Sequence, residues 1–283
     1  MDRKILVLAL STLLILISCT LRADTLDITF LDVAEGEAIV VKSGKHTALI
    51  DTGNIVSGHR VVQYLQSRDI AQLDMLLITH PHLDHLSGVF QILPHITVKQ
   101  RYDNGQTLPQ NQDIYRWYQD SFRTSNYRAL NRGDVLALGE TKLTVLSSLQ
   151  TGNMNRRSLV LLVEHGEVRV LLMGDADVSV EATMMEQIPN LNAKLLKLGH
   201  HGSENSTSQP FLDRVDPDYA VISTNADNIR GYPSPLIMDR VRQQGIDLLL
   251  TYEDGDICFR SDGEDLSPCS VIPVALGGPR TGG

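Results

Sequence analysis

The stretch Thr79-His80-Pro81-His82-Leu83-Asp84-His85 decides how this chain is interpreted. It directly follows a short apolar run that is typical of a buried strand. Alternate residues of a tight loop leaving a strand can point the same way, so His80 and His82 can present ring nitrogens to one metal ion. Asp84 and His85, turned by the start of the next helix, would address a second ion. Imidazole and carboxylate ligands favour zinc, with manganese as the alternative, so we expect two divalent metal ions here.

Two further strand ends carry groups that complete such a centre. Gly174-Asp175 and Gly199-His200-His201-Gly202 each follow an apolar run. Two metals about 3.5–4 Å apart need a bridging carboxylate, which we expect Asp175 to supply. We expect His200 to act behind a ligand or to donate to the substrate. The expected metal ligands are His80, His82, Asp84, His85, Asp175 and His201, and the expected catalytic residues are Asp84 and His200.

Clustering separates these histidines from the others. Five of the nine histidines stand in the two short runs. His46, His59, His95 and His165 stand singly and are interpreted as solvated or structural. Metal ions at such a centre lower the pKa of a bound water, and the hydroxide, oriented by Asp84, attacks a carbonyl or phosphoryl centre. The sequence therefore predicts a metal-dependent hydrolase.

The first 23 residues are typical of an export signal. Arg3 and Lys4 precede an apolar run over residues 5–17, which is short for a permanent membrane anchor. Cleavage could follow Ala23, or a lipoprotein signal could end at residue 18 and leave a lipid on Cys19; a buried N-terminal helix is the less favoured alternative. We expect a periplasmic or extracellular protein whose membrane contact, if it has one, is through that lipid. Residues 273–283 are expected to form a flexible tail.

Two other cysteines, Cys258 and Cys269, could close a short disulfide in an oxidising compartment or could fall together by chance. The net charge of −9 disfavours non-specific nucleic-acid binding. A local basic groove stays open as an alternative, because one stretch carries Lys99, Arg101, Arg116, Arg123, Arg128 and Arg132.

Hydrophobic periodicity predicts an alternation of strands and helices without an internal repeat. Residues 114–122 have helical spacing, which predicts a helix that packs on the domain and that could also line a substrate wall with another face. The other expected helices are residues 58–68 and 178–187, and the expected strands are residues 26–30, 38–41, 47–50, 75–78, 142–146, 159–163, 168–173, 194–198, 219–222 and 247–252.

Taken together, the motifs resemble the metallo-β-lactamase superfamily. The resemblance lies in the histidine run, in Leu49-Ile50-Asp51-Thr52-Gly53, in Gly174-Asp175 and in His200-His201-Gly202-Ser203. It is most specific for the domain that ends the DNA-uptake competence protein ComEC, through residues 30–39, 155–161 and 198–203. The resemblance covers residues 26–259 and implies an α/β fold, an αββα sandwich over residues 24–272 with Asp51 as a structural acid behind the metals. We expect a free-standing, exported counterpart of that domain.

In this branch the resemblance implies hydrolysis of phosphodiesters, including nucleic acids and phosphorylcholine esters. We therefore expect a phosphodiesterase or nuclease-like enzyme. Hydrolysis of a carbonyl ester, lactone or β-lactam is the enzymatic alternative, and a non-catalytic exported binding protein is the alternative of another class. Many superfamily members place a third histidine on the first metal, whereas Asn155 stands closest to that place here. The first metal is thus expected to be weaker, more solvated or absent.

Overall fold

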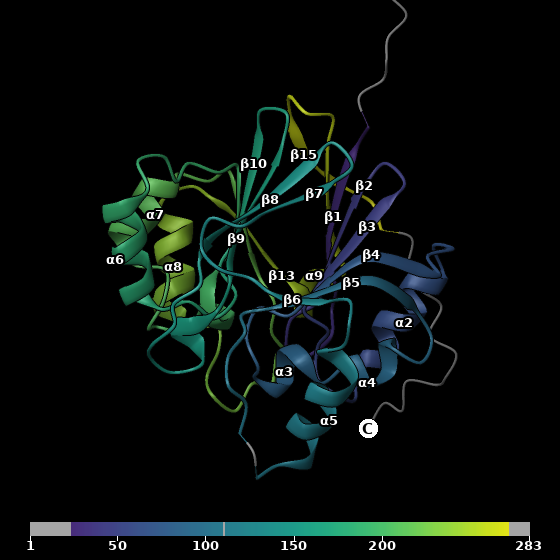
Figure 1. Ribbon diagram of the computed structural model, residues 1–283. Coiled ribbons are helices and arrows are strands. Elements are labelled where there is room, and N and C mark those ends of the chain that lie inside the picture. The colour runs from purple at the N-terminus through teal and green to yellow at the C-terminus, as the bar shows by residue number, and fades with distance from the viewer. Residues whose placement is uncertain (1–23, 110, 272–283) are drawn as a thin grey trace, which may run out of the picture.

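The computed structural model describes residues 24–109 and 111–271, and shows two β-sheets packed face to face with helices on both outer faces (Figure 1). This confirms the expected αββα sandwich. The largest apolar cluster fills the space between the sheets and includes Phe30, Leu143, Leu161 and Phe259, all fully buried. The expected export signal and the expected tail lie outside the described residues.

The first sheet has eight strands, in the order β15-β14-β1-β2-β3-β4-β5-β6. The strands β1, β2 and β3 pair antiparallel, and β3 to β6 pair parallel. The strands are β1 Leu26–Phe30, β2 Ile39–Ser43, β3 His46–Ile50, β4 Gln72–Leu77, β5 Thr97–Asp103, β6 Tyr127–Ala129, β14 Ile257–Ser261 and β15 Leu266–Cys269.

The second sheet has seven strands, in the order β13-β12-β11-β10-β9-β8-β7. The strands β10 to β13 pair parallel, and β7 to β10 pair antiparallel. The strands are β7 Val135–Leu138, β8 Thr141–Ser147, β9 Val160–His165, β10 Val168–Leu172, β11 Leu195–Lys197, β12 Tyr219–Ile222 and β13 Asp247–Leu250.

The helices bury the outer face of each sheet under a separate apolar cluster. The first sheet is covered by α2 Gly58–Gln66, α3 Leu83–Leu86, α4 Val89–Ile92 and α5 Asp113–Phe122, and the second by α6 Val178–Gln187, α7 Gln209–Val215 and α8 Pro235–Gln243 (Figure 1). The short helices α9 Thr251–Asp254, η1 Asn155–Arg157 and η2 Gly199–Gly202 lie in connections. None of the described helices is both long enough and apolar enough to cross a membrane.

Several elements differ from the sequence prediction, and the helices α4, α7 and α8 are among those that were not predicted. The strand predicted over residues 247–252 ends at Leu250, because the side chain of Asp254 accepts from the Leu250 amide and the chain turns into α9. The strands β5, β6, β7, β14 and β15 were not predicted. In β5, Thr97–Asp103, the exposed positions carry polar or charged side chains and the apolar positions are few, so its periodicity is weak, whereas β7, Val135–Leu138, is apolar but has only four residues.

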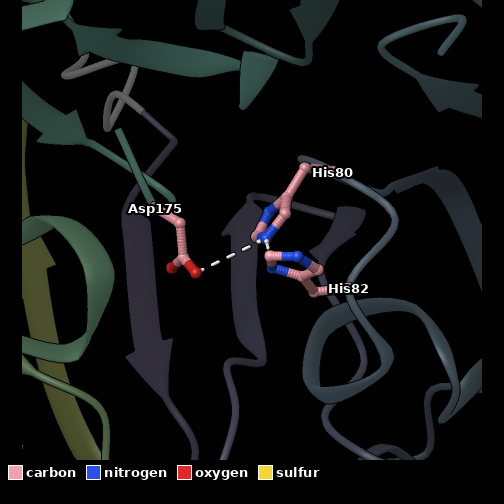
Figure 2. A group of neighbouring side chains, drawn as sticks. All are labelled: His80, His82 and Asp175. Atoms are coloured by element: carbon pink, nitrogen blue, oxygen red, sulfur yellow. Dashed lines mark hydrogen bonds and ion pairs between the residues drawn. The ribbon is translucent and has the colours of Figure 1, made fainter. Parts of the chain in front are cut away.

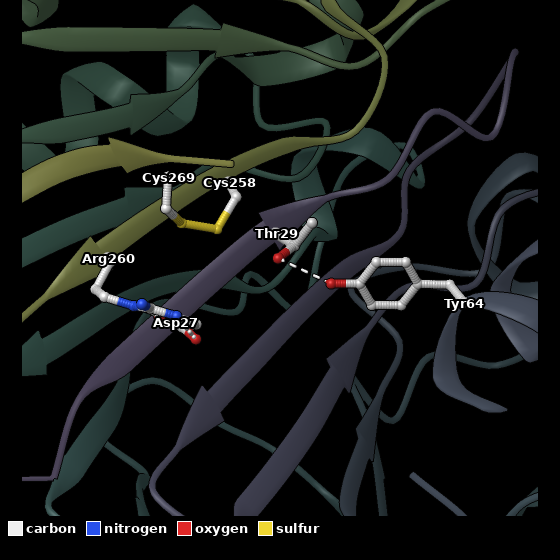
Figure 3. The surroundings of a disulfide bond; sticks show 6 residues. All are labelled: Asp27, Thr29, Tyr64, Cys258, Arg260 and Cys269. Atoms are coloured by element: carbon white, nitrogen blue, oxygen red, sulfur yellow. Dashed lines mark hydrogen bonds and ion pairs between the residues drawn. A yellow bond between two sulfur atoms is a disulfide. The ribbon is translucent and has the colours of Figure 1, made fainter. Parts of the chain in front are cut away.

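A disulfide joins Cys258 and Cys269, which lie directly opposite each other across β14 and β15 (Figure 3). Of the two alternatives that the sequence left open for these cysteines, the structure shows the disulfide. Nearby, the Arg260 guanidinium contacts the Asp27 carboxylate through two bonds of 2.6 and 2.8 Å, which fastens β14 to β1. The hairpin of β14 and β15 therefore belongs to the same sheet as β1.

We expect reduction of this disulfide to lower the free energy of unfolding by about 2–3 kcal/mol, because the bond restricts a short loop of the unfolded chain. Urea unfolding followed through Trp117 fluorescence, with and without dithiothreitol, measures the change. The Cys258→Ser, Cys269→Ser double variant is the control, since dithiothreitol should not affect it. Equal unfolding midpoints for the oxidised and reduced wild type would contradict the prediction.

Candidate metal centre

The centre lies where the carboxyl ends of strands from both sheets meet. Asp51 follows β3, and the run that begins at Thr79 follows the neighbouring β4. In the second sheet Asp175 follows β10, and His200-His201 follows the parallel strand β11. The Leu159 amide donates to the Thr79 carbonyl at 2.9 Å and thereby ties the two sheets together beside the centre.

Three of the predicted ligands form a first group. His80 and His82 reach in from the loop after β4, and Asp175 faces them from the other sheet (Figure 2). The His80 Nε2 lies 3.0 Å from His82 Nδ1 and 3.4 Å from Asp175 Oδ2. The three potential ligand atoms lie within 4.8 Å of one another, so they could hold one metal ion.

The other three predicted ligands form a second group, in which Asp84 and His85 from α3 meet His201. The Nε2 atoms of His85 and His201 are 3.3 Å apart, and His201 Nε2 lies 3.6 Å from Asp84 Oδ2. The second oxygen of Asp175 also faces this group, since its Oδ1 lies 3.3 Å from His85 Nε2 and 3.6 Å from His201 Nε2. One carboxylate therefore presents one oxygen to each group.

Hydrogen bonds on the far side of three rings direct their Nε2 atoms inward. The Nδ1 of His85 donates to the Asp51 carboxylate and the Nδ1 of His201 to the Ser223 carbonyl, both at 2.7 Å. The Thr79 hydroxyl donates to Asp51 at 2.7 Å, so its oxygen is left to accept from His80 Nδ1 at 3.1 Å. Such bonds fix the tautomer and the direction of a metal-binding imidazole.

The charges of the centre fit a bound cation. Burial alone lowers the pKa of His85, but the carboxylates of Asp175 and Asp51 outweigh burial and raise that pKa well above its usual range. The centre thus favours positive charge at His85 Nε2, and a divalent cation supplies it. The Oδ1 of Asp175 is buried and accepts no hydrogen bond within the described protein, which is a further fit to a cation.

Three other histidines of the centre, His82, His200 and His201, have lowered pKa values, which favours the neutral form that binds a metal. Burial, aided by the charge of His80, lowers the pKa of His82 to about 4. Burial also lowers the pKa values of His200 and His201. Burial raises the pKa of Asp175, but His85 and His201 outweigh it and hold that pKa well below the usual range.

The backbone that carries His200 and His201 is strained. Both residues have left-handed dihedrals, with φ of 49° and 53°. Non-glycine residues adopt this region rarely, and such strain gathers at functional sites. A Cβ on the preceding Gly199 would lie 2.6 Å from the Ala176 carbonyl oxygen, so a glycine is required for the close approach of this segment to the loop after β10.

A buried ion pair supports the same segment and was not predicted from the sequence. The Lys197 Nζ lies 2.5 Å from Glu37 Oε2, and both side chains are fully buried. Lys197 ends β11 and Glu37 precedes β2, so the pair links the two sheets behind the centre. Removing one partner of such a pair costs roughly 3–5 kcal/mol, because the other charge is left buried and alone.

A cavity of about 520 Å³ opens onto the centre, and its wall includes Asp175 and both expected catalytic residues. Tyr115 of α5 also lines it, whereas Tyr118 and Phe122 of that helix are buried in the core, so α5 both packs and borders the cavity. The cavity wall consists of Glu35, Asn54, His82, Leu83, Asp84, Tyr115, Asp175, His200, Arg230 and Tyr232. Arg230 was not predicted from the sequence, because it is a lone charged residue in a loop, and Glu35 was noted only as part of the motif over residues 30–39.

Asn155, which stands closest in the sequence to the missing third histidine, contacts His200. The Nδ2 of Asn155 lies 3.1 Å from His200 Nε2, and His200 Nε2 lies 3.9 Å from Asp175 Oδ2. The Oδ1 of Asn155 is buried and has no hydrogen-bond partner among the described residues. Asn155 thus holds the His200 ring at the edge of the first group without entering that group.

The predicted basic stretch does not form a free basic groove. Four of its six side chains pair with carboxylates: Lys99 with Asp74, Arg116 with Asp113, Arg123 with Asp103, and Arg128 with Asp134. The guanidinium groups of Arg101 and Arg132 donate to uncharged groups, the Ser121 carbonyl and the Gln187 side chain. Most of the positive charge of this stretch is therefore neutralised within the protein.

Residues 32–226 match the metallo-beta-lactamase superfamily. The chain is 28% identical over 254 residues to ComE operon protein 3 of Bacillus subtilis, covering 83% of this chain and 33% of that protein. It is 29% identical over 243 residues to competence protein ComA of Neisseria gonorrhoeae, covering 82% of this chain and 32% of that protein. The chain thus spans about a third of the length of these relatives. The metallo-beta-lactamase fold protein YhfI from Bacillus subtilis shares the fold, with 13% identity, a TM-score of 0.54, and coverage of 84% of this chain and all of that one.

We expect the wild type to bind two divalent cations per chain and His201→Ala to retain one, because His201 belongs to the second group alone. Asp175→Asn should lose both, since one oxygen of Asp175 faces each group. Elemental analysis after loading and desalting gives the metal content, and chelator should lower the Tm of the wild type. The exposed His95 provides the control variant His95→Ala, which should keep both ions. Two retained ions in Asp175→Asn would refute the shared role.

Proposed function

This chain belongs to the metallo-beta-lactamase superfamily and is a metal-dependent hydrolase, and we propose that it cleaves phosphodiester bonds. One observation carries the proposal: the two oxygens of Asp175 face two separate ligand groups at the floor of an open cavity. Two cations held side by side in this way suit an in-line displacement at phosphorus, because the attacking and the leaving oxygen can each be stabilised.

The residues have separate tasks in this proposal. His80, His82 and Asp175 would hold one cation, and Asp84, His85 and His201 would hold the other, with the second oxygen of Asp175 facing the second group. When bound, such a pair of divalent cations acidifies water and stabilises negative charge on the substrate. Zinc and manganese both fit the donor set of imidazoles and carboxylates.

Two residues contribute from the cavity wall. His200 faces the cavity as a neutral imidazole held by Asn155, so one of its ring nitrogens can donate to the substrate or to the departing oxygen. Asp84 lines the same cavity and lies beside His201, where its carboxylate can orient a water through a hydrogen bond. We propose these two as the catalytic residues.

We also propose that the chain is exported. The disulfide between Cys258 and Cys269 supports this, because such bonds persist in oxidising compartments. The basic and apolar composition of residues 1–23 supports it independently. The mass of the N-terminal peptide shows whether the exported protein is free or carries a lipid on Cys19.

We expect the wild type, loaded with zinc or manganese, to hydrolyse bis(p-nitrophenyl) phosphate, and His82→Ala to lose on the order of 100-fold or more in kcat/KM. The loss follows from the absence of one imidazole ligand. Release of p-nitrophenolate measures the rate.

His95→Ala, in which a surface histidine is removed, should retain wild-type activity. Nitrocefin and a homoserine lactone should be cleaved far more slowly than the phosphodiester. The assignment fails if a carbonyl substrate is preferred or if His82→Ala remains active.

A further inference from the structure

Arg230 is the only lysine or arginine among the described residues that line the cavity. It lies in the loop over residues 223–234 between β12 and α8, and about half of its side chain is exposed, at 51%. The other charged groups at the wall are the carboxylates of Glu35, Asp84 and Asp175. A single guanidinium therefore stands in an otherwise acidic cavity wall.

Arg230 is held above the second ligand group by two carboxylates. Its Nη1 lies 2.9 Å from Glu35 Oε1 and 3.5 Å from Asp84 Oδ2. Glu35 is itself fixed, because its carbonyl accepts from Asn54 Nδ2 at 3.1 Å. Glu35 thus fastens the loop that carries Arg230 to the loop between β1 and β2 of the other sheet.

A bound cation would weaken one of the two contacts of Arg230 and leave the other in place. Asp84 belongs to the second ligand group, so a cation there neutralises its charge and repels the guanidinium. Glu35 belongs to neither group and keeps its contact. Arg230 is then held by one carboxylate at the rim, with its remaining N–H donors free to bind an anion between the rim and the cations. A guanidinium fits phosphoryl oxygens through two parallel hydrogen bonds.

We propose that Arg230 binds the non-bridging oxygens of the substrate phosphodiester and that Glu35 is the positioning residue that keeps its guanidinium over the centre. This inference rests on the proposed phosphodiesterase function and adds its specificity determinant. Arg230 selects an anionic substrate over a neutral ester, because only the anion replaces the contact that Arg230 loses from Asp84.

The test compares Arg230→Met, Arg230→Lys and Glu35→Gln with the wild type, each loaded with the same metal. We expect Arg230→Met to raise both the KM for bis(p-nitrophenyl) phosphate and the inhibition constant of inorganic phosphate by about 10- to 100-fold. Arg230→Lys should recover part of this loss, because it keeps the charge without the planar pair of donors. Glu35→Gln should raise KM by a smaller factor and leave kcat near the wild-type value.

Three controls separate anion binding from other roles. Metal content should be unchanged in every variant, and the KM for the neutral ester p-nitrophenyl acetate should change less than about threefold. Arg128→Met removes an arginine of equal exposure that also pairs with a carboxylate, and it should behave as the wild type.

The outcomes distinguish this inference from the function on which it rests. If the wild type cleaves the diester and Arg230→Met has the same KM and phosphate inhibition, the role of Arg230 is refuted while the phosphodiesterase stands. An equal rise in KM for the neutral ester would also refute the role of Arg230, since Arg230 would then affect the shape of the cavity without discriminating between substrates by their charge. If the wild type binds two metals but cleaves only neutral esters, the proposed function and this inference both fail.

Discussion

The rest of the centre depends on the hydrogen bonds that the Asp51 carboxylate accepts. Asp51 is fully buried, its backbone is left-handed with φ of 56°, and it accepts from the Thr79 amide, the Thr79 hydroxyl and the His85 ring, each at 2.7 Å. Through Thr79 it also sets the orientation of His80. One anion thus joins β3, β4 and α3 and directs a nitrogen into each ligand group. A backbone of unfavourable conformation is retained here because three strong hydrogen bonds outweigh its cost.

Most of the fold and the composition of the centre could be predicted from the sequence, and the reason is local. Each candidate ligand follows an apolar run that forms a buried strand, and the carboxyl ends of parallel strands lie at one edge of a sheet. The motif around His80 therefore indicated that this loop lies at the edge of the sheet. The runs that precede Asp175 and His201 indicated the same position for these two residues. The αββα arrangement came from the family resemblance, because no single segment shows which face of a strand meets a second sheet.

What the sequence did not reveal depends on contacts between distant segments. Glu37 and Lys197 each look like ordinary charged residues until the fold buries them against each other. Arg230 stands in a loop without a motif, and it meets Glu35 only because the two sheets pack together. The edge strands β6 and β15 are short, and their alternation is too weak to separate from loop composition. Periodicity detects burial on one face of an element and carries no signal for a pair of charges from opposite halves of the chain.

The pairing of β1 with β14 has a consequence for how the chain reaches this structure. Asp27 and Arg260, which meet across that pair, are separated by 233 positions along the chain. Pairing over such a distance is slow, because a large loop must close before any contact is gained. Until β14 docks, β1 is an open sheet edge, and an open edge can pair with the same strand of another molecule. The chain is thus most prone to pairing with another molecule during folding, from the time when β1 forms until the hairpin of β14 and β15 docks against it.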